Sequence, residues 1–515
     1  MRALARSVAI TITIAGAACV LATSAAFANK ANDTLIWTSQ QEIATVDPYY
    51  GQVRPQIVNY RNACDSLIYR DPIKGEYLPH VATSWTWVDD TTLDRELRKD
   101  VKFHDGRMLS ADDVVYTFNH VAAPDSGVLA KSNVNWMSGA EKLGDYKVRV
   151  KLPKPFPAAL EYLSGSTPIL PKGHYDSAQV IGTANVRNYA ATPLVCTGPY
   201  KISKFIPGES VEMVRHEEYF GGAKGKAKIK TLLFRTIPDA EAQIAALLSG
   251  DVDWIQDVVK DKAEAMAAMP DISVVQTSTL RTRFIRFEVN GKKVKSPFMD
   301  VRVRQAVNHA INREAVSKNL VGGASQVLHA ACHPAQFGCT DDVRRYDYNP
   351  AKAKALLAEA GYPNGFEADF YAWRERSFTE ALLGDLAAVG IKTNLRYMQW
   401  NTVRPLMHDG TAYFTDASWG SFGIMDTSAL AGYFFGGSPD DGAKDPELIE
   451  MIKAGDTATD PEQRKAHYKK ALQRIAEQAY WAPLFTYAKY YAFSKDLNFT
   501  PHVDDIARFW LASWK

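Results

Sequence analysis

The sequence lacks a strong net charge and long basic runs. Its 515 residues include 60 lysines and arginines against 58 acidic residues. The first 28 residues hold two of the arginines and no acid, so the chain that follows them is neutral. A nucleic-acid binder, or a protein held on anionic lipid, needs a basic surface. We therefore expect neither kind of partner.

Long apolar runs are also missing, apart from one near the start. Arg2 and Arg6 precede an apolar run from Val8 to Leu21 that is rich in Ala and Thr. This run is a poor bilayer span, which needs about 20 residues. It ends near the sequence Ala26-Phe27-Ala28, and this order is typical of a secretory signal peptide. We predict that residues 1–28 are a signal peptide, that the protein is periplasmic, and that the mature chain has no membrane span.

Cysteine is scarce, with five in the chain. Cys19 leaves a lipoprotein cleavage site open, although Gly16-Ala17-Ala18 lacks the branched residue usually found three positions before a lipidated cysteine. Export permits disulfides among the other four. Cys332 and Cys339 flank a short segment, CHPAQFGC, whose Pro and Gly can turn the chain back, so we predict that they pair.

The spacing of these cysteines fits no zinc pattern, and we expect no metal site. Cys64 and Cys196 are either a second bridge or two buried thiols, and the sequence leaves both open.

Motifs of catalysis are absent as well. The sequence has no GxSxG or HExxH motif, and its 11 histidines are scattered. His104-Asp105-Gly106 and Gly198-Pro199-Tyr200 have the residue types of turns, without the glycine spacing and lysine of a phosphate loop. We predict a binding protein without a cofactor rather than an enzyme, and an exported hydrolase is the rival hypothesis.

Helices and short strands are mixed along the chain. Capping residues and apolar faces predict helices at 111–121, 240–249, 350–360 and 461–479. Stretches rich in β-formers lie at 34–39, 146–152, 211–216, 230–237 and 282–289. About 490 residues are too many for one core, since domains of roughly 100 to 200 residues are typical. We predict an α/β protein of two or more lobes.

Six segments in order carry a family resemblance. The most distinctive is YLPHVATSWTWVDDTTLDRELRKDVKFHDGRMLSADDVVYTF at 77–118. The others are CTGPYKISKFIPGESVEMVRHEEYFGG, LLFRTIPDAEAQIAALLSGDVDWI, PFMDVRVRQAVNHAINREAV, YNPAKAKALLAEAGYPNGF and LAAVGIKTNL. Together they resemble the family 5 extracellular solute-binding proteins, which include periplasmic dipeptide-, oligopeptide-, glutathione- and nickel-binding proteins.

The resemblance implies a two-lobed clamp, the type II periplasmic-binding-protein fold with an extra subdomain. The expected parts are a lobe I core at 29–61, 191–284 and 489–515, an extra subdomain at 62–190, and lobe II at 285–488. The chain would cross between lobes near Arg283 to Asn290 and return near Pro483 to Phe493, which makes a hinge of two strands. The implied partners are a small-molecule ligand and the membrane permease of an ABC importer, served by a monomer.

The ligand-binding segments depart from those of the peptide-binding relatives, in which acidic residues after a Trp-containing strand neutralise the ligand amine. Here SWGSFGIMD places Trp419 at the aromatic position, Phe422 where the first acid would stand, and Asp426 one residue away from the second. Loss of a buried carboxylate removes the partner of an ammonium group. The segment therefore argues against a free peptide amine.

Other candidate contacts also come from the resemblance. Arg374, with Arg376 second, lies near the position that holds a ligand carboxylate in the dipeptide-binding protein, and an arginine fork suits that group. The remaining candidates are the cleft-edge loop Ser39, Gln40, Gln41 and Glu42, and the rings of Trp136, Trp373 and Trp400. We predict a peptide-like or modified-amino-acid solute; opines, oligosaccharides, aromatic acids and metal chelates stay as alternatives.

Overall fold

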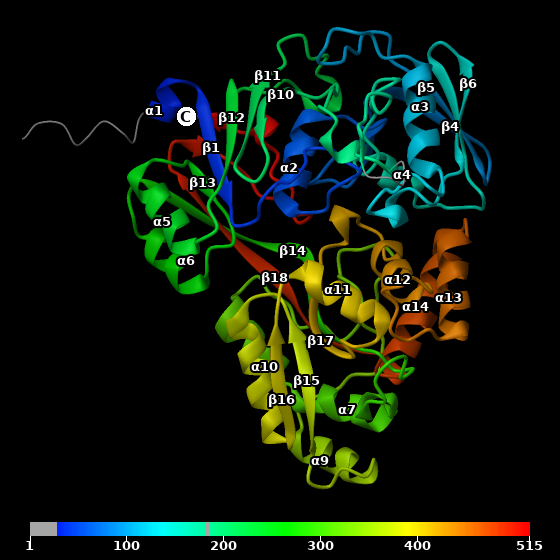
Figure 1. Cartoon of the computed structure of the whole chain (residues 1–515), viewed down its shortest axis with the longest axis vertical. Helices are drawn as coiled ribbons and strands as arrows, with labels where there is room; N and C mark the ends of the chain where they lie inside the picture. The colour runs from blue at the N-terminus through cyan, green and yellow to red at the C-terminus, as the bar shows by residue number, and fades with distance from the viewer. Residues whose placement is uncertain (1–27, 182–185) are drawn as a thin grey trace, which may run out of the picture.

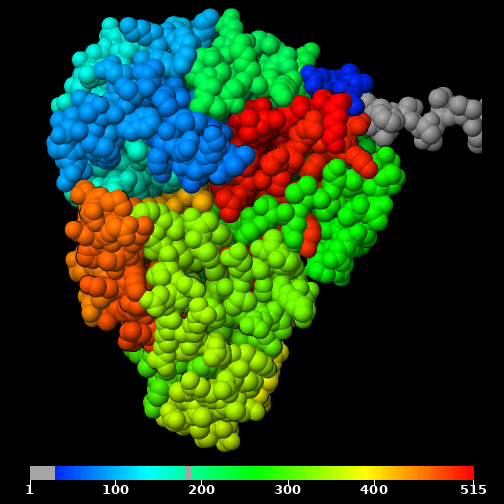
Figure 2. All heavy atoms as spheres, turned by 180° about the vertical axis from the view of Figure 1, so that it is seen from behind, coloured from blue at the N-terminus to red at the C-terminus, as the bar shows by residue number. Residues whose placement is uncertain are grey.

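The computed structural model describes residues 28–181 and 186–515. The predicted signal peptide and Cys19 fall outside this range, apart from Ala28. Figure 1 shows two lobes, one above the other, with the long strands β14 and β18 running between them. Seen from behind in Figure 2, the orange segments of the lower lobe lie against the blue and cyan segments of the upper lobe.

A ten-stranded mixed sheet runs through both lobes, in the order β10-β11-β12-β1-β13-β18-β14-β17-β15-β16. The strands of the upper lobe are β1 (Thr34–Ser39), β10 (Tyr200–Ile206), β11 (Ser210–Arg215), β12 (Thr231–Thr236) and β13 (Trp254–Ile255). Those of the lower lobe are β15 (Phe366–Ala372), β16 (Ile391–Tyr397) and β17 (Phe414–Trp419). The chain therefore has the predicted α/β architecture of two lobes.

Two long antiparallel strands, β14 (Ile272–Phe287) and β18 (Trp481–Ser494), connect the lobes. Their ladder shifts register between Ser278 and Thr282, where Leu280 N–H donates to Val503 O at 2.7 Å. Beyond this break, β14 also pairs with β17 of the lower lobe. The change of partners lies just before the predicted crossing at Arg283, and the lobe boundaries themselves stay predictions.

The extra subdomain contains a four-stranded sheet, β4-β5-β7-β6. These strands are β4 (Ala82–Asp89), β5 (Thr92–Leu97), β6 (Gly139–Gly144) and β7 (Lys147–Lys151). Short pairs are β2 (Ile68–Arg70) with β3 (Tyr77–Pro79), β8 (Val180–Ile181) with β9 (Val186–Arg187), and β19 (Leu497–Asn498) with β20 (Ser513–Trp514). One buried cluster includes both Trp37 of β1 and Val148 of β7, so the subdomain shares its core with lobe I.

Helices surround these sheets. Those of the upper lobe are α1 (Ala28–Ala31), α2 (Arg54–Ala63), α3 (Ala111–Ala122), α4 (Ala159–Leu163), α5 (Ala240–Ser249) and α6 (Lys260–Ala267). The lower lobe has α7 (Val301–Ala310), α8 (Arg313–Val316), α9 (Pro350–Glu359), α10 (Arg376–Ala388), α11 (Trp400–Asp409), α12 (Ser428–Phe435), α13 (Pro446–Thr457) and α14 (Pro461–Glu477). In the described part of the chain, no helix is both long and apolar enough to cross a bilayer.

The predicted caps explain where several helices start and stop. Asp239 accepts a hydrogen bond from the backbone N–H of Ala242 at 2.7 Å, and Gly250 ends α5 in the left-handed region at φ 82°. At α3, the Asp113 carboxylate accepts the N–H of Ser110 at 2.8 Å, as in a capping box.

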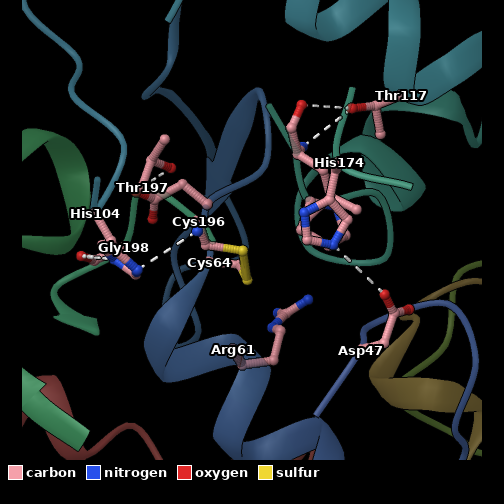
Figure 3. The surroundings of a disulfide bond; sticks show 12 residues. Asp47, Arg61, Cys64, His104, Thr117, His174, Cys196, Thr197 and Gly198 are labelled. Atoms are coloured by element: carbon pink, nitrogen blue, oxygen red, sulfur yellow. Dashed lines mark hydrogen bonds and ion pairs between the residues drawn. A yellow bond between two sulfur atoms is a disulfide. The ribbon is translucent and has the colours of Figure 1, made fainter. Parts of the chain in front are cut away.

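Two disulfides are present in the structure. The predicted pair Cys332–Cys339 is joined, and so is Cys64–Cys196, which the sequence left open. Cys64 is the residue that follows α2, and Figure 3 shows it bonded to Cys196 at that end of the helix. The bond therefore fixes one end of α2 against the segment that leads into β10.

Candidate functional site

Three arginines from distant parts of the sequence meet between the lobes. Arg54 opens α2 in the upper lobe, Arg281 lies at the register shift of β14, and Arg374 follows β15 in the lower lobe. A Cβ placed on Gly420 would lie 3.0 Å from Arg54 Nη2 and 3.3 Å from Arg281 Nη2. The absence of a side chain at Gly420 therefore leaves room for both guanidinium groups.

This arginine cluster carries more positive charge than its neighbours balance. Arg54 has a carboxylate of Asp505 at 3.3 Å. Within residues 28–181 and 186–515, neither Arg281 nor Arg374 has a carboxylate within 4.0 Å, and Arg374 Nε is buried without a hydrogen-bond partner. Burial, together with the charges of Arg374 and Arg54, lowers the pKa of Arg281 to about 10. An anion at this position would remove the imbalance.

A paired network holds the backbone next to Arg374. Arg283 is fully buried and donates from Nε to Asp416 Oδ1 at 2.9 Å and from Nη1 to Glu375 Oε2 at 2.8 Å. Tyr487 also donates its hydroxyl to Glu375 at 2.7 Å. Burial opposes the ionisation of Glu375, but Arg283 and Arg374 outweigh it and hold its pKa below the ordinary value. This network anchors Glu375 and therefore holds the backbone next to Arg374 in place.

Aromatic rings lie beside the arginine cluster. Trp419 stacks on Tyr433 with ring centroids 4.4 Å apart, and Phe422 meets Trp419 edge-on at 4.9 Å. Trp373 and Trp400 form a second pair at 4.8 Å, and Trp373 packs against the same apolar cluster as Trp419. Arg281 donates to Ser418 Oγ at 3.2 Å, which ties the arginines to the Trp419 strand. Flat rings next to a cation suit a solute with both apolar and anionic parts.

Asp426 has a structural partner. Arg464 forms a bidentate pair with its carboxylate, with both nitrogen–oxygen distances at 2.8 Å, and the side chains of both residues are buried. The adjacent disulfide loop also fixes this segment, since Gln336 donates to the carbonyl oxygens of Ile424 and Asp426. Asp426 is therefore already neutralised, and the structure gives no support to its predicted contact with a ligand.

Several other predicted residues are not brought to the arginine cluster. Trp136 is 3% exposed, stacks on Phe156, and belongs to the core that contains the extra subdomain, so it does not line the cleft. Arg376 is exposed and pairs with Glu380 at 2.8 Å on its own helix. Ser39 is buried at the end of β1, and Gln40, Gln41 and Glu42 are exposed. In the described ranges, no hydrogen bond or ion pair joins this loop to the arginine cluster.

Arg54, Arg281 and Tyr433 were not among the residues predicted from the sequence. A signal for Arg281 was present, because TLRTRFIRF repeats arginine inside an otherwise apolar strand, and a buried arginine needs a partner. For Arg54 and Tyr433 we find no local signal. In the part of the chain that the structure describes, no group of three or more His, Cys, Asp or Glu side chains is arranged to hold a metal ion.

A two-lobed fold with a charged and aromatic site between the lobes defines a class of proteins that bind small molecules by closure. Comparisons with known proteins agree. Residues 76–442 match the family described as bacterial extracellular solute-binding proteins, family 5. Heme-binding protein A of Haemophilus influenzae is 27% identical over 441 residues, which cover 79% of this chain and 78% of the relative.

Solved structures show the same fold. The ABC transporter-associated periplasmic binding protein DppA from Helicobacter pylori, in complex with the peptide STSA, has a TM-score of 0.82 at 23% identity, covering 93% of this chain and 98% of that one. NikZ from Campylobacter jejuni, in complex with Ni(L-His), has a TM-score of 0.82 at 22% identity with the same coverage. The chain belongs to family 5 of the bacterial extracellular solute-binding proteins. It is the solute-binding component of an ABC importer and not an enzyme.

Proposed function

We propose that this protein captures an anionic, peptide-like or modified-amino-acid solute between its lobes in the periplasm and delivers it, as a monomer, to a membrane permease. The observation that carries the proposal is the pair Arg281 and Arg374, half-buried between the lobes with no carboxylate within 4.0 Å in the described ranges. A guanidinium group binds a carboxylate or phosphate through two parallel hydrogen bonds. The solute supplies that group.

The three arginines also explain why such a solute would close the clamp. Arg54 belongs to the upper lobe, Arg374 to the lower lobe, and Arg281 to the strand between them. An anion that contacts all three interacts with both lobes, so it binds the closed form more tightly than the open form. The closed form would then be the state that the permease recognises.

A free amine is a poorer fit than a carboxylate. Asp426 is paired with Arg464, and Phe422 replaces the acid expected before it. In the same segment, Trp419 and Tyr433 offer ring faces instead of a second charge. A solute whose amine is blocked, modified or absent suits these surroundings.

The alternative ligands divide by charge. Opines, aromatic acids and metal chelates built on carboxylates have the anionic group that the arginine cluster would take. A neutral oligosaccharide lacks it and would cover two half-buried arginines without giving them a charge partner, which costs free energy. The unbalanced charge of Arg281 and Arg374 therefore favours the anionic alternatives over the oligosaccharide.

Native mass spectrometry of the protein purified from its own periplasm tests the proposal. We expect a bound solute that carries a carboxylate or phosphate, released intact on denaturation. A neutral or cationic solute would contradict the anionic assignment. Release of a chemically altered product from an added candidate would instead support the rival hydrolase.

A further inference from the structure

A second arginine on α2 lies apart from the arginine cluster. Arg61 follows Arg54 by seven residues, which places both on the same face of the helix, two turns or about 10 Å apart. Figure 3 shows Arg61 projecting from α2 below the Cys64–Cys196 disulfide. Helix α2 therefore presents one guanidinium group at each end of a single face.

Arg61 lines a polar cavity together with two other arginines, Arg70 and Arg508. Each of these two has its own carboxylate: Arg70 Nε lies 3.1 Å from Glu161, and Arg508 Nη1 lies 2.8 Å from Asp504. Tyr77 also donates its hydroxyl to Glu161 at 2.7 Å. The acids of the cavity are thus already engaged by partners other than Arg61.

The guanidinium of Arg61 has no partner of this kind. In residues 28–181 and 186–515, it makes no hydrogen bond, and no carboxylate lies within 4.0 Å of it. Burial lowers the pKa of Arg61 below its ordinary value; Tyr60 and Asp504 oppose this shift, and Arg508 adds to it. Ser164 and Ser166 line the same cavity, and the Ser164 hydroxyl already donates to the carbonyl oxygen of Glu161 at 2.7 Å. The cavity therefore holds one surplus positive charge and the hydroxyl of Ser166 as a hydrogen-bond donor.

The fold makes room for Arg61 at Gly165. A Cβ on Gly165 would fall 1.4 Å from Arg61 Nη1, which is too close for two non-bonded atoms. Any other residue at this position would displace the guanidinium from its present place. Gly165 lies beside Ser164 in the wall of a second cavity that Arg61 also lines. The absence of a side chain at Gly165 therefore allows the Arg61 guanidinium to lie in its present position.

The lower lobe completes the cavity. Phe422, Gly423 and Ile424 line it from the opposite side, and the next residue, Met425, donates its backbone N–H to Glu161 Oε1 at 2.9 Å. Gly420, two residues before Phe422, lies beside Arg54 and Arg281, whose guanidinium groups occupy the space that a Cβ on Gly420 would need. One short stretch of the lower lobe thus spans the distance between the arginine cluster and Arg61.

We propose that Arg61, with Ser166, forms a second anion subsite that the Phe422–Ile424 segment covers when the lobes close. The solute would be a dianion whose two acidic groups lie about 10 Å apart, one at the arginine cluster and one at Arg61. This assignment of the solute rests on the proposed function, whereas the anion subsite itself rests on the surroundings of Arg61.

Bromide anomalous diffraction tests the subsite. Crystals of the wild-type protein, Arg61→Gln and Gly165→Ala are soaked in sodium bromide and measured at the bromine absorption edge. We expect a peak in hydrogen-bonding range of the Arg61 guanidinium in the wild type and none in either variant. No peak at Arg61 in the wild type overturns the proposal, and a peak retained in Arg61→Gln identifies an adventitious ion only. Gly165→Ala, which displaces the Arg61 guanidinium without changing Arg61 itself, carries the test if Arg61→Gln does not fold.

A matched pair of probes tests the dianionic character. Sebacate has a carboxylate at each end of a ten-carbon chain, and decanoate has the same chain with one carboxylate. We expect sebacate to raise the thermal midpoint of the wild type more than decanoate, and we expect this difference to vanish in Arg61→Gln but persist in the control Arg345→Gln, whose side chain is 54% exposed. Equal shifts in the wild type contradict the dianion.

The outcomes distinguish a failure of the anion subsite from a failure of the proposed function. Bromide at Arg61 without any solute in native mass spectrometry would leave the subsite standing and remove the proposed function. A bound solute without bromide at Arg61 would do the reverse.

Discussion

Arg281 and Arg283 lie two positions apart on β14, yet their surroundings are opposite. Arg283 has Asp416 and Glu375 as charge partners, so its positive charge is balanced. Arg281 faces Arg54 and Arg374, and burial with these charges lowers its pKa to about 10. A buried charge with partners holds the fold together, while a buried charge among like charges is completed by a ligand of opposite sign. By this criterion, Arg283 is a structural arginine and Arg281 is a candidate binding arginine.

Removing the paired arginine has the largest expected effect. In Arg283→Met, Asp416 and Glu375 lose their cation, and the free energy of unfolding falls by about 3–5 kcal/mol because a buried charge is left unpaired. Urea denaturation measures this loss. The control Arg345→Gln removes an exposed arginine and changes stability by less than about 0.5 kcal/mol. A loss below about 1 kcal/mol in Arg283→Met would show that the network is not structural.

Removing Arg374 affects binding instead of folding. We expect Arg374→Ala to lower the affinity for the solute found by mass spectrometry by about 2–5 kcal/mol, because its anionic group loses a buried partner. The urea midpoint stays close to that of the wild type. Isothermal titration with the same solute measures the change, and Arg376→Ala, which removes an exposed arginine, serves as the control. Equal affinities for wild type and Arg374→Ala would remove Arg374 from the site.

Removing Arg281 should change both stability and binding, by smaller amounts and in opposite directions. In the absence of solute, Arg281→Met removes a cation that repels Arg54 and Arg374, so we expect stability to rise by about 1 kcal/mol. Affinity for the solute falls at the same time. Thermal unfolding with and without solute distinguishes the two effects, and a stability loss in the free protein would contradict the repulsion.

The smallest effect is expected for a buried acid, where the same contrast between a paired and an unpaired charge exists. In residues 28–181 and 186–515, Asp456 forms no ion pair with an arginine, unlike Asp426. Burial raises the pKa of Asp456 to about 7, although Tyr468 donates a hydrogen bond to it at 2.7 Å. Since the folded state holds this proton more tightly than the unfolded state, its contribution to stability is lost as pH rises from about 4 to 7. We expect Asp456→Asn to be about 1 kcal/mol more stable than the wild type at pH 8 and equal to it near pH 4. Parallel stability curves over this pH range would contradict the shift.

Local signals predicted much of the fold. Asp239 and Gly250 bound α5 as their residue types indicate, because a cap depends on neighbours within a few residues. Strand β14 was expected at 282–289 but spans Ile272–Phe287. Its first half is polar and half-buried, and it becomes a strand through pairing with β18. That partner is distant in sequence, so no local pattern showed it.

The candidate site was predicted less well than the fold. Trp419 and Arg374 could be named from family segments, and the structure places both in the region between the lobes. Arg54 could not be named, because an unbalanced charge exists only once three distant segments meet. Trp136 shows the opposite problem, since a ring that fills a core has the same sequence signature as a ring that lines a cleft.

The register break in β14 also determines how stiff the joint between the lobes can be. Between Ser278 and Thr282 the strand is not paired with β18 in the ladder, and an irregularity of this kind bends the strand and increases the local twist of the sheet. Arg281 lies in this same stretch. An anion bound to Arg281 would connect this irregular stretch of β14 to both lobes and reduce the amplitude of their relative rotation. The solute would then restrict the motion between the lobes as well as being the molecule that is transported.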